Sequence, residues 1–196
     1  QDHGAADILF VAAAGNGNVL GEGIDLDSDP RGFFPASYDL SNVVSVAAGD
    51  TDDSLAVFSN CGGTSIDLAA PGVGILSTEP GGGLAFRNGT SMAAPHVTGT
   101  ALLVWANLPE ATMSEVQNAV LQSTDANGSL SGRVSTGGRV NANGALQIDT
   151  FAPRSTLDVA DDITIDGGTE QTITITLRDN ALVDVDSIDD ADLRVT

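Results

Sequence analysis

Ser91 stands where a glycine-containing turn gives way to a long, alanine-rich stretch, in the segment Asn88-Gly89-Thr90-Ser91-Met92-Ala93-Ala94-Pro95-His96-Val97. We expect a helix over residues 91–107, ending before Pro109. A serine at a helix N-terminus faces unpaired backbone N–H groups and the positive end of the helix dipole. That environment suits a nucleophile whose attack generates an oxyanion. The same serine can also act only as a helix cap, and the residue alone leaves both readings open.

A second candidate is Asn16, which directly follows the apolar run of residues 8–14. A short continuous apolar run is typical of a strand buried on both faces of a parallel sheet. An asparagine amide offers an N–H donor without adding charge, as an oxyanion site requires. Taken alone, an asparagine beside Gly17 is more typical of an ordinary turn.

Together and in this order, the segments Phe10–Asn16 and Gly89–Val97 resemble the corresponding segments of the subtilisin-like serine proteases, the subtilases. Shorter stretches in family order extend the resemblance over about residues 1–148: 34–38, 58–59, 67–72 and 138–141. The resemblance implies that Ser91 is the nucleophile and Asn16 an oxyanion-hole donor. It also implies a cis peptide bond before Pro35 and a set of substrate-binding residues, namely Ala13, Ala14, Gly15, Phe33 and Asn88.

The sequence departs from the family in its catalytic base. A subtilase uses Asp, His and Ser in that chain order. The chain holds two histidines, His3 and His96. His3 lacks the family's histidine motif, and we expect it to be a surface residue. His96 follows Ser91 by five helical positions, about 140° around the axis, so it cannot reach the Ser91 hydroxyl and we expect a hydrogen-bonded core histidine. We therefore expect the Asp and His to lie on another part of the protein, and the chain alone to be inactive.

No cofactor is needed for this chemistry, but calcium is a candidate structural ion. The resemblance implies a cation site formed by Asp67 with backbone carbonyls near Ala36 and Tyr38. Hard cations take carboxylate and carbonyl oxygens. A solvated loop aspartate is an equally good interpretation of Asp67. The alternating acidic residues at 25, 27 and 29 form a weaker candidate, since they lack the Gly and Glu of an EF-hand loop.

The surrounding elements predict a layered α/β domain, and the resemblance implies a doubly wound, mostly parallel subtilisin-like sheet without its N-terminal part. Apolar runs predict further strands at 43–48, 66–70 and 75–78. Helices are expected over 112–123, where Thr112 and Glu115 fit a capping box, and over 141–148. This catalytic-domain part is assigned to residues 1–150.

Residues 151–196 differ in character. The stretch 171–177 alternates polar and apolar residues, the period of a half-buried strand, and short strands are expected at 163–165 and 193–195. An immunoglobulin-like sandwich takes about 100 residues. We interpret 151–196 as the start of an all-β module, loosely resembling bacterial immunoglobulin-like or cadherin-like repeats.

Composition limits the partners. The chain of 196 residues carries 7 basic and 27 acidic residues, a net charge of −20, and every basic residue is Arg. Such a charge repels phosphate backbones, so we expect no nucleic-acid partner. No apolar run reaches the ~20 residues that span a bilayer. The leading hypothesis is an extracellular serine endopeptidase acting on protein or peptide substrates. The alternative is a non-catalytic subtilase-like domain in an extracellular adhesive protein.

Overall fold

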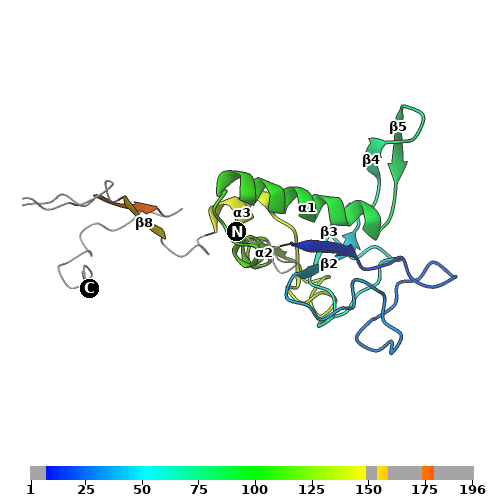
Figure 1. The fold of residues 1–196 in the computed structure, drawn as a ribbon. Coiled ribbons are helices and arrows are strands. Elements are labelled where there is room, and N and C mark those ends of the chain that lie inside the picture. The colour runs from blue at the N-terminus through cyan, green and yellow to red at the C-terminus, as the bar shows by residue number, and fades with distance from the viewer. Residues whose placement is uncertain (1–7, 149–153, 159–173, 179–196) are drawn as a thin grey trace, which may run out of the picture. The chain divides into compact units, whose positions relative to one another are not determined.

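The computed structural model describes residues 8–148, 154–158 and 174–178 (Figure 1). The chain divides into two compact units, Gln1–Ile148 and Asp149–Thr196. His3 and the strands expected at 163–165 and 193–195 lie outside the described residues.

The core of the first unit is a five-stranded sheet with the order β1-β2-β3-β7-β6. Its strands are β1 (Phe10–Ala13), β2 (Val43–Gly49), β3 (Leu68–Pro71), β6 (Asp125–Ala126) and β7 (Gly138–Arg139). β1, β2, β3 and β7 pair in parallel, and β6 pairs antiparallel with β7. The mostly parallel sheet confirms the expected α/β class. The apolar runs predicted as strands correspond to β1, β2 and β3. Strands β6 and β7 are too short to be predicted from a sequence pattern.

Helix α1 (Thr90–Asn107) packs against β1, β2 and β3 and carries Ser91 in its first turn (Figure 1). It contains no Asp, Glu, Lys or Arg. Its buried residues are small or β-branched, namely Thr90, Ala93, Val97, Thr100, Ala101 and Val104. Small side chains allow the helix axis to approach the sheet closely, which fixes the first turn relative to the strand ends.

Helices α2 (Met113–Gln122) and α3 (Ala142–Gln147) pack against α1 and against each other. The capping box expected at the start of α2 is confirmed. Thr112 accepts a hydrogen bond from the Glu115 N–H, and the Glu115 side chain accepts one from the Thr112 N–H. Two backbone donors that α2 leaves unpaired are thereby satisfied. The Asn141 side chain caps α3 by accepting from the Gly144 N–H.

The antiparallel hairpin of β4 (Ile75–Thr78) and β5 (Leu84–Arg87) leads directly into the Ser91 segment (Figure 1). β4 was expected from the sequence and β5 was not. At the base of the hairpin, the Asn88 side-chain oxygen accepts a 2.7 Å hydrogen bond from the Gly74 N–H. The segment that leads into α1 is therefore held by the β4–β5 pairing and by the Asn88–Gly74 hydrogen bond.

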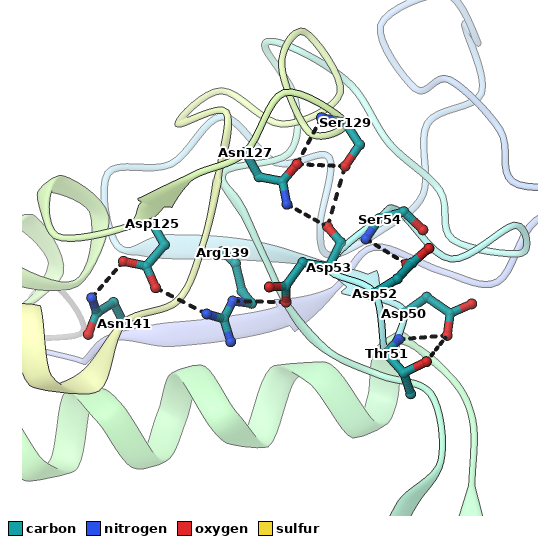
Figure 2. A network of polar contacts seen from close by, with 10 residues as sticks. All are labelled: Asp50, Thr51, Asp52, Asp53, Ser54, Asp125, Asn127, Ser129, Arg139 and Asn141. Atoms are coloured by element: carbon teal, nitrogen blue, oxygen red, sulfur yellow. Dashed lines mark hydrogen bonds and ion pairs between the residues drawn. The ribbon is translucent and has the colours of Figure 1, made fainter.

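An ionic network ties the turn after β2 to the β6–β7 edge (Figure 2). The Arg139 guanidinium lies 3.2 Å from Asp53 Oδ1 and 3.1 Å from Asp125 Oδ2. Asn141 donates to the other Asp125 oxygen at 2.7 Å, and Asn127 donates to the Asp53 carbonyl at 3.0 Å. The two contacts of Asp53 join segments more than 70 residues apart in sequence.

In the second unit, β8 (Arg154–Asp158) pairs antiparallel with β9 (Thr174–Arg178). β9 overlaps the alternating stretch 171–177. Described residues give only this strand pair, so an all-β module remains a prediction.

Candidate active site

The Ser91 side chain is exposed in the first turn of α1, beyond the carboxyl end of β1. The N-cap residue is Gly89, with φ 150° and ψ 159°, and no side chain caps the helix. Residues other than glycine rarely adopt this backbone conformation. Ser91 therefore does not serve as the cap. Its neighbours' N–H groups already have acceptors, because Thr90 donates to Asn16 and both Met92 and Ala93 donate to the Gly89 carbonyl.

Asn16 lies beside this helix start because the loop after β1 turns back toward it. The Asn16 Oδ1 atom accepts a 2.9 Å hydrogen bond from the Thr90 N–H and a 3.0 Å bond from the Thr90 hydroxyl. With the amide oxygen occupied twice, the Nδ2 group remains the outward donor of the exposed Asn16 side chain. Ser91 and Asn16, 75 residues apart in the sequence, are thus brought to one place.

Thr90 was not singled out from the sequence, although it directly precedes the candidate nucleophile Ser91. It is fully buried. Its hydroxyl donates to Asn16 and accepts a 3.1 Å hydrogen bond from the Gly15 N–H. Thr90 therefore couples the helix start to the Gly15 backbone and to the Asn16 side chain.

Gly15 has a positive φ of 97°, and there is no room for a side chain. A Cβ atom there would lie 2.6 Å from the Asn60 side-chain nitrogen and 2.9 Å from the Phe33 ring. Glycine is therefore required for both backbone conformation and close packing. Phe33 is partly exposed and covers the face of Gly15.

The other expected substrate-binding residues lie nearby in the chain but differ in exposure. Ala13 ends β1, and Ala14 is fully buried with its N–H bonded to the Val46 carbonyl at 2.9 Å. Asn88 is exposed, and its side-chain oxygen is used by Gly74. The peptide bond between Phe34 and Pro35 is cis, as the resemblance implied.

Met92 flanks the same site. Its sulfur lies 3.7 Å from the point where a Gly89 Cβ would stand, and the Asn16 side-chain nitrogen lies 3.4 Å from that point. A thioether and the candidate oxyanion donor therefore share one small volume beside the helix start.

The expectation for His96 was wrong in one respect: the residue is exposed, not part of the core. Its Nδ1 lies 2.9 Å from the Met92 carbonyl, one turn back on α1. The described elements do not cover the side of α1 that carries His96, which lines an open groove there. Among the described residues, no other histidine approaches Ser91.

Asp67 is partly buried, directly precedes β3, and contacts Ser45 of β2. Its Oδ2 accepts hydrogen bonds from the Ser45 N–H at 2.7 Å and the Ser45 hydroxyl at 2.9 Å. Burial raises the pKa of the Asp67 carboxyl above its ordinary value, although the Ser45 hydrogen bonds act in the other direction. Carboxylate oxygens are ligands that hard cations take, but both Ser45 donors already bond Oδ2 of Asp67. Within the described part of the chain, no group of three or more His, Cys, Asp or Glu side chains could hold a metal.

In the acidic loop before β2, Asp27 and Asp29 bind groups of the protein itself. Asp27 accepts hydrogen bonds from the backbone and hydroxyl groups of Thr64 and Ser65. Burial raises the pKa of Asp27, but these hydrogen bonds outweigh it and leave the pKa below the ordinary value. Asp29 pairs with Arg31 at 2.7 Å, which lowers the pKa of Asp29 to about 2. Both carboxylates thus hold loops together.

Comparison with known proteins agrees with this geometry. The profile of the subtilase family, Peptidase_S8, matches residues 1–146. Alkaline elastase YaB of Bacillus sp. (strain YaB) is 41% identical over 114 residues, covering 58% of this chain and 27% of the relative. Subtilisin DY of Bacillus licheniformis is 40% identical over 123 residues, covering 63% and 41%.

Subtilisin BL of Lederbergia lenta is 36% identical over 140 residues, covering 71% of this chain and 46% of the relative. A solved structure of the subtilase cytotoxin SubAB assembly superposes with a TM-score of 0.64 at 28% identity, covering 71% of this chain and 48% of that one. The chain spans less than half the length of each of these relatives. It belongs to the subtilase family and contains a serine-protease-like domain.

Proposed function

We propose that this chain is the serine-bearing part of a subtilase endopeptidase, with Ser91 as nucleophile and Asn16 as oxyanion donor. The observation that carries the proposal is the double hydrogen bond from Thr90 to Asn16 Oδ1, which leaves Nδ2 to donate beside Ser91. A donor held before the reaction begins stabilises developing charge without reorganising.

In the proposed reaction, Ser91 Oγ attacks the carbonyl carbon of a peptide bond and its proton passes to a histidine base. The carbonyl oxygen becomes an oxyanion that accepts from Asn16 Nδ2 and the Ser91 N–H. The C–N bond then breaks, the amine leaves with the proton, and an acyl-serine ester remains. Water, deprotonated by the same histidine, hydrolyses the ester and returns the proton to Ser91.

The histidine and its orienting carboxylate are proposed to come from chain outside these 196 residues. Two uncovered apolar surfaces support this. α1 has no charged residue, and a helix apolar on every side is normally buried on every side. Yet Leu102 is 59% and Leu103 52% exposed. They line a groove of about 770 Å³ with Pro71, Pro95, His96 and Gly99.

The second uncovered surface is β1, the outer strand of the five-stranded sheet. Phe10 on this strand is 51% exposed, and no described strand pairs with its outer edge. Parallel strands are normally buried within a sheet rather than open to water. Further subtilase elements would cover both surfaces and bring the base to Ser91.

The substrate slot is proposed to be apolar and narrow. Phe33 covers the face of Gly15, which carries no side chain, so the residue before the scissile bond would meet an aromatic ring and backbone. Replacing Phe33 with Ala should widen the slot. Peptides with a large aromatic residue at this position should gain kcat/KM relative to peptides with Ala.

A structural cation, calcium in the first instance, is proposed at Asp67 with the carbonyls of Ala36 and Tyr38. Its only role there would be to stabilise the fold near the Phe34–Pro35 turn, and no catalytic step passes through it. We also propose an extracellular location and a β module beginning near residue 151. The structure contains no helix, within the described residues, of the length and apolarity needed to cross a membrane.

The test compares two proteins on a fluorogenic peptide: these 196 residues alone, and a longer chain that also carries the family's Asp and His segments. We expect turnover only from the longer chain, abolished by Ser91→Ala. A longer chain that binds protein but hydrolyses nothing would favour the non-catalytic, adhesive alternative. Turnover by the 196 residues alone, lost in Ser91→Ala, would overturn the proposal that the base lies elsewhere.

A further inference from the structure

Asn60 is a buried side chain whose polar atoms all reach one segment, the loop that carries Asn16. Only 1% of the residue is exposed. Its Nδ2 donates to the Ala14 carbonyl at 2.8 Å, and its Oδ1 accepts from the N–H groups of Gly17 and Ile24, each at 3.0 Å. Its backbone N–H donates to the Gly15 carbonyl at 3.0 Å.

These four contacts surround Asn16 in the chain. Ala14 and Gly15 precede it, Gly17 follows it, and Ile24 lies where the loop returns. An amide can both donate and accept in fixed directions, so one side chain fixes the two ends of this turn at once. Buried hydrogen bonds of this kind are costly to leave unmade, so the turn has little freedom to move away from Asn60.

Asn60 and Thr90 hold different groups of the loop. Thr90 binds the Asn16 side chain and the Gly15 N–H. Asn60 binds the Gly15 carbonyl and the backbone on either side. The Asn60 nitrogen also fills the space where a Gly15 side chain would stand. The Asn16 donor is therefore fixed by one residue through its amide and by the other through its backbone.

We infer that Asn60 is a positioning residue for the oxyanion donor: it holds the backbone of Asn16 so that Nδ2 meets the transition state. This rests on the proposed function. Oxyanion donors act only at the correct distance, and a displacement near 1 Å can cost on the order of 100-fold in rate. Loss of the Asn60 contacts should therefore reduce kcat more than it changes KM, since the donor matters most in the transition state.

Ser59 supplies the matched control. It is buried like its neighbour, and its hydroxyl accepts from the Ala48 N–H at 2.8 Å and donates to the Asn60 carbonyl at 2.9 Å. No contact of that hydroxyl reaches residues 14–24. Ser59→Ala thus removes two buried hydrogen bonds at the residue adjacent to Asn60, while the contacts between Asn60 and the Asn16 loop remain.

The first experiment measures kcat and KM of Asn60→Ala and Ser59→Ala in the longer, active chain, well below both melting temperatures. Asn60→Ala should lower kcat about tenfold or more with KM within about twofold, whereas Ser59→Ala should leave kcat unchanged. Equal kcat for the two variants would overturn the inference.

Asn60→Asp guards against a variant that fails to fold. The introduced carboxyl keeps the acceptor for Gly17 and Ile24, but faces the Ala14 carbonyl with an oxygen in place of Nδ2. Only its protonated form can donate there. The ratio of variant kcat to wild-type kcat should rise as the pH falls. A ratio that does not change with pH would contradict the inference.

A measurement without catalysis separates this inference from the proposed function. In the 196-residue chain, nuclear magnetic resonance should find that Asn60→Ala shifts the Asn16 side-chain amide signals and speeds hydrogen exchange at Gly17 and Ile24. Ser59→Ala should do neither. If these shifts appear but Ser91→Ala leaves activity intact, the proposed function fails and the positioning contact stands. If neither Asn16 nor Gly17 responds, the positioning inference itself is wrong.

Discussion

The side chain of Thr90 and its backbone N–H both donate to Asn16 Oδ1, at 3.0 Å and 2.9 Å. This relationship decides which end of the Asn16 amide faces the reacting group. Without it the amide could rotate and present its oxygen, which would repel an oxyanion. Thr90, beside the proposed nucleophile, thus sets the orientation of a proposed donor that lies 74 positions earlier in the chain.

The first prediction concerns Asn16 itself. In the longer, active chain, Asn16→Leu should lower kcat roughly 10²–10³-fold while KM changes little, the size reported for such a donor in subtilisin. Leucine has a similar volume but no N–H, so only transition-state stabilisation is lost. Steady-state kinetics on one peptide measure both constants. A rise in KM with kcat unchanged would assign Asn16 to substrate binding or structure instead.

Met92 provides the second prediction. Oxidation adds an oxygen to a sulfur that shares its small volume with the Asn16 side-chain nitrogen. The bulk should crowd the tetrahedral intermediate more than the planar substrate, so peroxide should reduce kcat more than it raises KM.

Met113 is the control, since it is buried at the start of α2. Met92→Ala should resist peroxide and Met113→Ala should not. Should Met92→Ala lose activity as fast as the wild type, Met92 does not lie beside the oxyanion site.

Asp67 gives a prediction about pH and calcium. Burial raises the folded-state pKa of Asp67, so the folded state binds a proton more readily than the unfolded state. Its ionisation therefore costs stability as the pH rises from the unfolded value near 4 through the raised folded value. Without calcium, Asp67→Asn should melt at a higher temperature than the wild type at pH 7, with the difference vanishing near pH 3.

Calcium should reverse this order if the proposed cation site exists. Adding it should raise the melting temperature of the wild type more than that of Asp67→Asn. Exposed Glu22 is the control, because Glu22→Gln removes one charge from the same acidic chain at a residue adjacent to none of the proposed ligands. An identical calcium response in all three proteins would reduce the effect to general charge screening.

Arg139 yields a stability prediction. Its guanidinium joins Asp53 and Asp125 from separate segments (Figure 2). Each partly exposed ion pair contributes at most about 1 kcal/mol, so Arg139→Met should lower the free energy of unfolding by about 1 kcal/mol at low salt. The loss should shrink in high salt, because exposed charges are screened.

Arg31→Met removes an ion pair that is local to one loop, the pair with Asp29, and serves as the comparison. It should change the free energy of unfolding by less than Arg139→Met does, because the Arg31 side chain is the more exposed to solvent of the two arginines. Urea unfolding measures both variants. A larger effect at Arg31 than at Arg139 would contradict the role given to the network.

Local signals in the sequence were sufficient where the structure itself is local. The capping box of Thr112 and Glu115 joins residues three apart, and the expected helix at Ser91 begins one residue earlier than predicted. Asn60 could not be found this way, because its side-chain partners lie 36 to 46 positions away in the sequence. No local pattern distinguishes a buried asparagine with such partners from any other asparagine.

The same distinction explains the errors. β7 is a two-residue strand defined only by its pairing with β3 and β6, so no periodicity marks it. The exposure of His96 depends on what covers the outer side of α1, which the helix sequence alone does not specify. Family resemblance, rather than periodicity, predicted the cis bond before Pro35.

The most direct test of the central claim is covalent labelling of Ser91 by a fluorophosphonate, which reacts with a serine only when a base activates it. Intact-protein and peptide mass spectrometry would give the stoichiometry and the site. We predict one label per molecule, on Ser91, in the longer chain with the Asp and His segments, and none in the 196-residue chain or in Ser91→Ala. A label on any other serine of the longer chain, or none at all, would contradict the assignment of Ser91 as the nucleophile.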